Sequence, residues 1–123
     1  MKPRLSILLP AMLGYEAALT ALGAWEMQTC RDQLEILILC PDHLGPTEAQ
    51  TAALSPGQVI VPVGPADLHE ARAIGIQQAS GDYILLAEDH WTHAFGTPTL
   101  RQASIRLLDA ALHALIGRQP PTR

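Results

Sequence analysis

Basic clusters, aromatic side chains and cysteines are all scarce in this sequence of 123 residues. Eight Lys and Arg face twelve Asp and Glu, which gives a formal net charge of -4. Because no cluster of Lys and Arg is available to neutralise phosphates, this composition argues against binding to nucleic acid. It also provides no polybasic anchor for a membrane surface. With two Trp, two Tyr and one Phe, the core of the protein must be mainly aliphatic.

The two cysteines and the hydrophobic runs indicate where the protein works. Cys30 and Cys40 form no CxxC motif, so we expect reduced, core-like thiols in a cytoplasmic protein. The longest aliphatic run, Ile36–Cys40, is far shorter than the ~20 residues of a membrane-spanning helix, and we predict no transmembrane segment. Residues 5–13 follow two basic residues as in a signal peptide, but Pro10 interrupts the run.

Several motifs that mark common enzyme classes are missing. No GxGxxG follows the first apolar run, and the sequence contains no GxxxxGK[ST]. The sequence therefore lacks the glycine-rich loop that binds phosphates in ordinary dinucleotide-binding proteins and in P-loop nucleotide hydrolases, which argues against both functions. The GxSxG motif of α/β-hydrolases is absent as well.

Apolar runs and helical periodicity alternate along the first three-quarters of the chain. Proline or glycine ends most of these segments, which separates short buried strands from amphipathic helices. We predict strands at residues 5–9, 35–40, 58–61 and 82–87, and helices at 15–29, 47–54, 67–79 and 100–116. This alternation predicts an α/β fold with a mainly parallel sheet of about four strands flanked by helices. We expect residues 1–90 to form the domain, and residues 91–123 to add a loop, a helix and a tail to it.

In such sheets the ligand crevice lies beyond the carboxyl ends of the strands, where the strand order reverses. If the first and fourth strands are neighbours at that reversal, two segments meet there. These segments are Pro10–Met12 and Glu88–His90.

The tripeptide Glu88-Asp89-His90 is the sharpest candidate for chemistry. A short acidic group at the end of a strand can hold Mg²⁺ or Mn²⁺ beside a diphosphate, and the imidazole of His90 suits Mn²⁺ better. Two alternatives remain open at this point. In the first alternative, the tripeptide is a solvated acidic turn. In the second alternative, His90 and His93 bind zinc together with Glu88 or Asp89.

The order of several short motifs resembles a known family. The matching segments lie within residues 4–90 and read Leu5-Ser6-Ile7-Leu8-Leu9-Pro10, Ala71-Arg72-Ala73-Ile74-Gly75, Gly81-Asp82-Tyr83 and Glu88-Asp89-His90. Together they resemble the nucleotide-sugar-binding half of the family-two glycosyltransferases, which have the GT-A fold. In that family the middle segment typically reads Ala-Arg-Asn-x-Gly, and the last strand ends in an Asp-x-Asp metal motif.

The resemblance implies a Rossmann-like GT-A half-domain that binds a nucleoside-diphosphate sugar, a UDP- or GDP-sugar, with Mn²⁺ or Mg²⁺. Pro10 and Ala11 would line the base and ribose, and Arg72 would help to fix the nucleotide. A structural alternative for Arg72 is an ion pair with Asp67, Glu70 or a neighbouring loop. Glu88 would lie close to the ribose and the metal, and His90 would take the place of the direct metal ligand.

The sequence departs from the family pattern where the base is read and where the acceptor binds. The stretch after the second strand is Cys40-Pro41-Asp42-His43, so Asp42 would have to read the base from a shifted position. We find no general base for an inverting transfer among residues 91–123, where Asp109 is the single acid and lies within a predicted helix. We therefore expect a donor-binding domain that is incomplete for catalysis alone.

A non-catalytic module is the alternative from another class. In that case the chain has a GT-A-like fold but no longer binds a nucleotide sugar. Its function is then to interact with another protein or to form a dimer. The wide apolar stripe of the helix predicted at residues 100–116 would then form the interface of a homodimer.

Overall fold

The computed structural model describes residues 3–87, 106 and 109–117. Strands and helices alternate along residues 5–86, as the sequence predicts. They are β1 (Leu5–Pro10), α1 (Tyr15–Glu26), β2 (Leu34–Cys40), α2 (Glu48–Ala52), β3 (Gln58–Pro62), α3 (Leu68–Gln78) and β4 (Tyr83–Leu86). Short 3-10 turns at Arg31–Gln33 and Asp42–Leu44 precede β2 and follow it.

The four strands form one parallel sheet in the order β3-β2-β1-β4. β1 lies in the middle, where Leu5 pairs with Leu34 of β2 on one side and with Tyr83 of β4 on the other. The chain moves outward from β1 to β3 and then returns to the far side of β1. The strand order therefore reverses between β1 and β4, and these two strands are neighbours, as the expected crevice requires.

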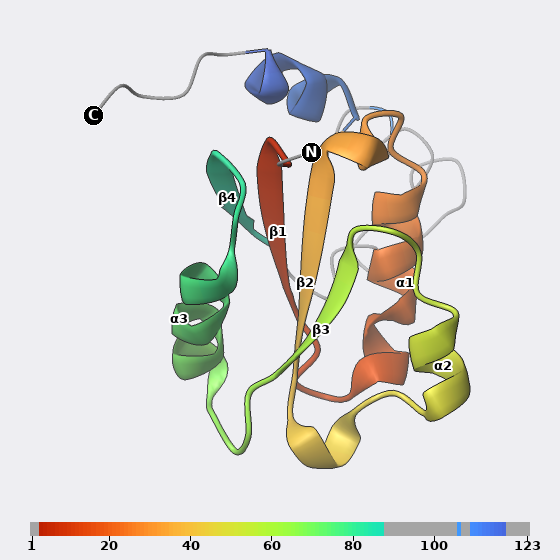
Figure 1. The fold of residues 1–123 in the computed structure, drawn as a ribbon, viewed down its shortest axis with the longest axis vertical. Coiled ribbons are helices and arrows are strands. Elements are labelled where there is room, and N and C mark those ends of the chain that lie inside the picture. The colour runs from red at the N-terminus through yellow and green to blue at the C-terminus, as the bar shows by residue number, and fades with distance from the viewer. Residues whose placement is uncertain (1–2, 88–105, 107–108, 118–123) are drawn as a thin grey trace.

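Helices cover both faces of the sheet, so the central strands are buried (Figure 1). Leu5, Ile7 and Leu9 of β1 point into a core cluster shared with α1, whereas Leu8 belongs to a second cluster with Ala71 of α3. Because β1 faces an apolar layer on each side, its residues are apolar at every position except Ser6 rather than alternating between polar and apolar. The fold is α/β with a Rossmann-like arrangement of strands and helices.

The first helix ends three residues earlier than the sequence predicts. α1 stops at Glu26, and the backbone N–H of Gln28 bonds to the carbonyl of Trp25 in a turn. The side chain of Gln28 folds back and donates from Nε2 to the carbonyl oxygen of Ala24 at 3.0 Å. This bond satisfies one of the carbonyls that a helix end leaves free.

A helical segment near the C-terminus closes the amino-end edge of the sheet (Figure 1). Residues 109–116 are helical, and Leu112, with 2% of its surface exposed, belongs to the same core cluster as Trp25. Nη2 of Arg4 donates to the carbonyl oxygen of Ile116 at 2.9 Å. The buried face of this segment thus packs on its own domain, and the homodimer stays a prediction. No helix among the described residues has the length and apolarity needed to cross a membrane.

A polar network joins the amino ends of three strands. The carboxylate of Glu35 accepts from Ser6 Oγ at 2.8 Å and from the backbone N–H and hydroxyl of Ser80 at 3.0 and 2.9 Å. The N–H of Gly81 donates in turn to Ser6 Oγ at 2.8 Å. Burial alone would raise the pKa of Glu35, but these hydrogen bonds outweigh it and lower the pKa below the ordinary value of 4.5.

We expect Glu35→Gln to lower the free energy of unfolding by about 1–2 kcal/mol at neutral pH, because an amide cannot accept all three bonds. The lowered pKa means that the carboxylate stabilises the fold above its unfolded-state pKa. That stabilisation is lost as the pH falls through the folded-state pKa, below 4.5. Urea unfolding across this range should show the two proteins converging in acid, while the exposed Glu16→Gln control stays within about 0.5 kcal/mol of wild type throughout. A constant difference between Glu35→Gln and wild type at every pH would contradict this account.

Candidate functional site

The carboxyl edge of the sheet, where strand order reverses, begins at the end of β1. Beyond Pro10 the chain stays attached to β2, because the N–H of Ala11 donates to the carbonyl oxygen of Leu39 at 2.7 Å. A tight turn follows, in which the N–H of Gly14 bonds to Ala11, and Gly14 has a φ of 114° that favours glycine. Pro10 and Ala11 are both buried, whereas Leu13 is 81% exposed. The end of β1 is therefore a fixed rim, and the exposed side chain on it belongs to Leu13.

Asp42 holds the carboxyl ends of β2 and β3 together. Its Oδ1 accepts from the backbone N–H of Gly64 at 3.0 Å, in the turn that follows β3. The same carboxylate helps to raise the pKa of the nearby Cys40 thiol, although burial is the larger cause. Cys40 is thus a neutral thiol that donates to the carbonyl oxygen of Leu44 at 3.2 Å, and it has a structural role here. Asp42 is exposed at this rim, with one oxygen engaged in the turn.

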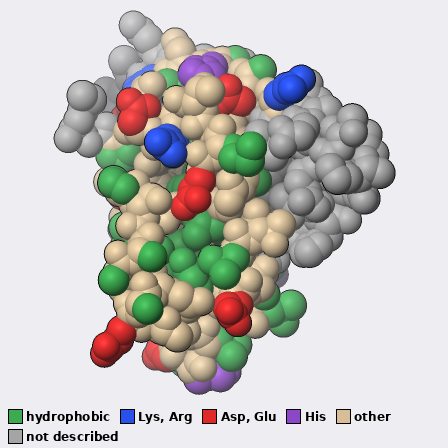
Figure 2. Space-filling model, turned by 90° about the vertical axis from the view of Figure 1, so that its right-hand side faces the viewer, with side chains coloured by type: hydrophobic (Ala, Val, Ile, Leu, Met, Phe, Trp, Pro, Cys, Tyr) green, Lys and Arg blue, Asp and Glu red, His purple; other side chains and the backbone are tan. Residues whose placement is uncertain are grey.

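A surface hollow of about 370 Å³ opens at this edge, between the start of α1 and the start of α2. Its lining mixes apolar side chains with Glu16, Thr47 and Gln50, and consists of Leu13, Gly14, Tyr15, Glu16, Leu44, Gly45, Thr47 and Gln50. Figure 2 shows the side of the molecule that carries α1 and α2, with hydrophobic side chains gathered in its middle and acidic ones around them. The hollow is large enough for a small polar ring with its substituents.

Arg72 projects from the first half of α3, on the opposite face of the sheet from α1. It forms no ion pair with the two acids nearest on its helix. Asp67 and Glu70 are instead engaged with each other's backbone in a capping box, which starts α3. Arg72 is half-buried, and its Nε is a buried nitrogen with no hydrogen-bond partner among the described residues. An ion pair of Arg72 with Asp67 or Glu70 is therefore not observed, and its Nε is a buried donor without a partner among the described residues.

The tripeptide Glu88-Asp89-His90 and His93 lie outside the described residues. The nearest described position is Ala87, whose N–H donates to the carbonyl oxygen of Leu8 at 2.9 Å. The chain therefore leaves the sheet directly beside β1. The roles that the sequence assigns to Glu88 and His90 stay predictions.

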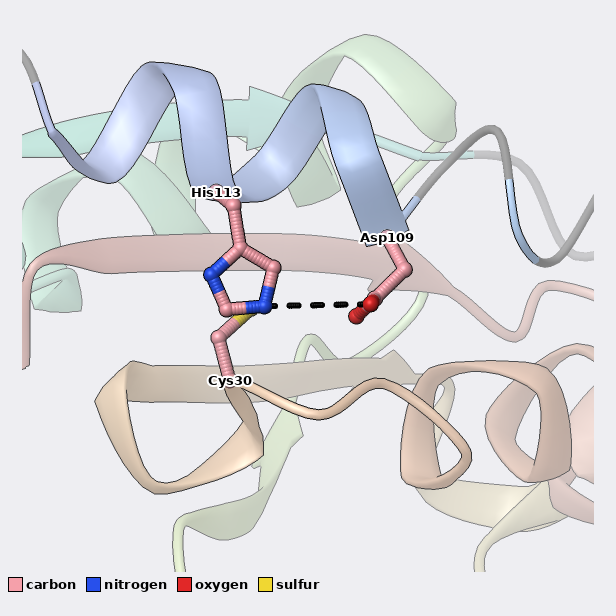
Figure 3. Close-up of side chains that lie close together, drawn as sticks. All are labelled: Cys30, Asp109 and His113. Carbon is pink, nitrogen blue, oxygen red and sulfur yellow. Dashed lines mark ion pairs between the residues drawn. The ribbon is translucent and has the colours of Figure 1, made fainter.

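A second group of chemically capable side chains lies at the opposite, amino-end edge of the sheet (Figure 3). Cys30, Asp109 and His113 each present a donor atom, and these atoms all lie within 4.8 Å of one another. Burial, and then the charge of Asp109, raise the pKa of the Cys30 thiol. This group could not be predicted from the sequence, because its members come from segments about 80 positions apart. The one available signal was the i,i+4 spacing of Asp109 and His113 on a helix.

No known family model matches this chain, and no curated protein matches it. The described structure itself establishes an α/β protein with a parallel sheet and a strand reversal beside β1. Ligand crevices of such sheets form at this reversal.

Proposed function

We propose that this chain is the donor-binding half of a glycosyltransferase-like protein of the GT-A fold. Its ligand would be a nucleoside-diphosphate sugar, a UDP- or GDP-sugar, taken up at the carboxyl edge of the sheet in a cytoplasmic protein. The observation that carries the proposal is the buried Nε of Arg72, which lacks a partner among the described residues on a helix that starts at this same edge. An unpaired cation beside a strand reversal fits an anionic ligand such as a diphosphate.

The remaining roles follow from position and chemistry. We assign the hollow beside Leu13 and Tyr15 to the base. Pro10 and Ala11 precede its lining residue Leu13 in the chain, and Asp42 lies two residues before Leu44, which also lines it. Asp42 would have to read the base with the oxygen that Gly64 does not use.

Glu88 and His90 are the residues we assign to the metal. A carboxylate and an imidazole are a donor set that Mn²⁺ accepts more readily than Mg²⁺. When bound, the divalent ion would stabilise the negative charge of the diphosphate leaving group as a Lewis acid. Arg72 would share that charge from the side of α3. We assign no general base, so we propose donor binding without transfer by this chain alone.

Isothermal titration of the full chain with UDP- and GDP-sugars in the presence of Mn²⁺ tests this function. We expect heat of binding for one of the two nucleotides. Arg72→Gln should weaken the affinity by about ten- to a hundredfold, since a charge-assisted hydrogen bond is worth roughly 1.5–3 kcal/mol. Glu88→Ala and His90→Ala should weaken it as well. Arg31→Gln, an exposed arginine at the amino-end edge, is the matched control and should bind like wild type.

Two results would contradict the proposal in different ways. A wild-type chain that binds neither nucleotide would favour the alternative, a GT-A-like interaction module without donor binding. Sugar transfer to an acceptor by the isolated chain would overturn the conclusion that it is incomplete.

A further inference from the structure

The amino-end edge of the sheet gathers three metal-ligating side chains that the proposed donor site does not use. Cys30 lies between α1 and β2, and Asp109 and His113 lie one turn apart on the C-terminal helical segment. Figure 3 shows the imidazole of His113 and the carboxylate of Asp109 pointing down from the helix towards the loop that carries Cys30. Two segments that are remote in the sequence thus bring a thiol, an imidazole and a carboxylate together.

The distances within this group are close to those of a tetrahedral centre. Zn²⁺ bonds of about 2.0–2.3 Å to oxygen, nitrogen and sulfur separate neighbouring ligand atoms by roughly 3.3–3.7 Å. Nε2 of His113 already lies 3.7 Å from Oδ2 of Asp109. All three donor atoms lie within 4.8 Å of one another, so small side-chain shifts would complete the geometry.

We propose that Cys30, Asp109 and His113 bind a zinc ion. A thiolate with an imidazole favours Zn²⁺ over the hard cations Mg²⁺ and Ca²⁺, which prefer oxygen ligands only. The side chain of His113 is about half exposed, at 51%, so water can reach the group and take the fourth position. Cys30 is 1% exposed and forms the inner wall of the site.

Thr29 provides the support that metal ligands commonly have. Its backbone N–H donates to Oδ1 of Asp109 at 2.8 Å, which leaves Oδ2 to face His113. The hydroxyl of Thr29 lies 2.6 Å from Nε2 of His113 and 2.9 Å from Oδ2 of Asp109. The hydroxyl therefore contacts the two atoms that the ion would bind, and the ion would replace it there.

Zinc at this position would join the C-terminal helical segment to the connection between α1 and β2. Ligand binding to the folded state alone stabilises it by mass action. The ion would thus hold Leu112 in the core, at the end of the sheet opposite to the nucleotide.

Titration of the full, reduced chain with Co²⁺, a spectroscopic substitute for Zn²⁺, tests the proposal. A thiolate bound to Co²⁺ gives charge-transfer absorption in the near ultraviolet, which oxygen and nitrogen ligands do not give. We expect this absorption to saturate at one equivalent and to disappear when Zn²⁺ is added. Cys30→Ser should abolish it, and Cys40→Ser, which changes the other buried cysteine, should retain it. His113→Gln should weaken the affinity for Co²⁺ by at least about tenfold.

Thr29→Val separates a metal site from a hydrogen-bonded contact between helix and loop. If the group binds metal, removal of the competing hydroxyl should leave the Co²⁺ affinity equal to that of wild type or higher. A Thr29→Val chain that no longer binds Co²⁺ would overturn the proposal, as would charge-transfer absorption that survives Cys30→Ser. Cobalt bound without this absorption, for example at His90 and His93, would overturn it too. Because His113 is half exposed, His113→Gln decides the question if Cys30→Ser does not fold.

Discussion

Gly81→Ala is expected to lower the free energy of unfolding by about 2–4 kcal/mol, since overpacking against backbone is among the costliest substitutions. A Cβ on Gly81 would lie 2.7 Å from the backbone nitrogen of Ser6 and 2.9 Å from the carbonyl carbon of Leu5. Both atoms belong to β1, which is hydrogen-bonded on both sides and cannot move without disturbing β2 and β4. The extra methyl group would also lie 2.8 Å from Ser6 Oγ, the atom that accepts from the N–H of Gly81.

Gly23→Ala is the matched control for this substitution. Gly23 lies within α1, and a Cβ there would meet nothing within 4 Å. We expect this variant to gain up to about 1 kcal/mol, because alanine is the better helix former. Urea unfolding followed by circular dichroism measures both variants. A Gly81→Ala chain as stable as wild type would show that β4 does not enter the sheet as closely to β1 as described.

Local sequence was sufficient to predict the elements, but it did not reveal why particular residues are required. The apolar run of β1 and the proline that ends it predict a buried parallel strand, and the structure confirms it. Ser80 and Gly81 likewise predict the end of α3. The close approach of Gly81 to Ser6 could not be predicted, because it depends on a contact between residues 75 positions apart.

The two ends of the sheet differ in how far the sequence predicts them. At the carboxyl edge, alternation of strands and helices predicts a parallel sheet whose strand ends share one edge, but the pairing of β1 with β4 comes from the structure. The role of Arg72 comes from the family resemblance and stays a prediction. At the amino-end edge, the group formed by Cys30, Asp109 and His113 depends on where the C-terminal helix packs. Helical periodicity predicts that helix, but it does not determine the part of the core that the helix covers.

Leu112→Ala is expected to lower the free energy of unfolding by about 2–4 kcal/mol, the usual range for a fully buried leucine. Leu112 is 2% exposed and shares a core cluster with Trp25 and Leu34 at the amino-end edge. Its neighbours on the helix, Asp109 and His113, bond to Thr29 on the surface, where such contacts contribute less. Leu112 is the one buried residue among residues 109–117, whereas Leu115 and Ile116 are partly buried against the same cluster. We therefore expect burial of Leu112 to contribute most to holding the segment on the sheet.

Leu13→Ala makes the same chemical change at a side chain that is 81% exposed, and it should alter stability by less than about 0.5 kcal/mol. Urea unfolding compares the two variants directly, and equal midpoints would show that the C-terminal segment is not docked.

Because Asp109 and His113 reach Cys30 only when the segment is docked, Leu112→Ala should also weaken Co²⁺ binding, whereas Leu13→Ala should not. Saturating Zn²⁺ should in turn recover part of the stability that Leu112→Ala removes, because binding and docking are linked in both directions. If Zn²⁺ raised the free energy of unfolding of both variants equally, zinc binding would not depend on docking of the C-terminal segment.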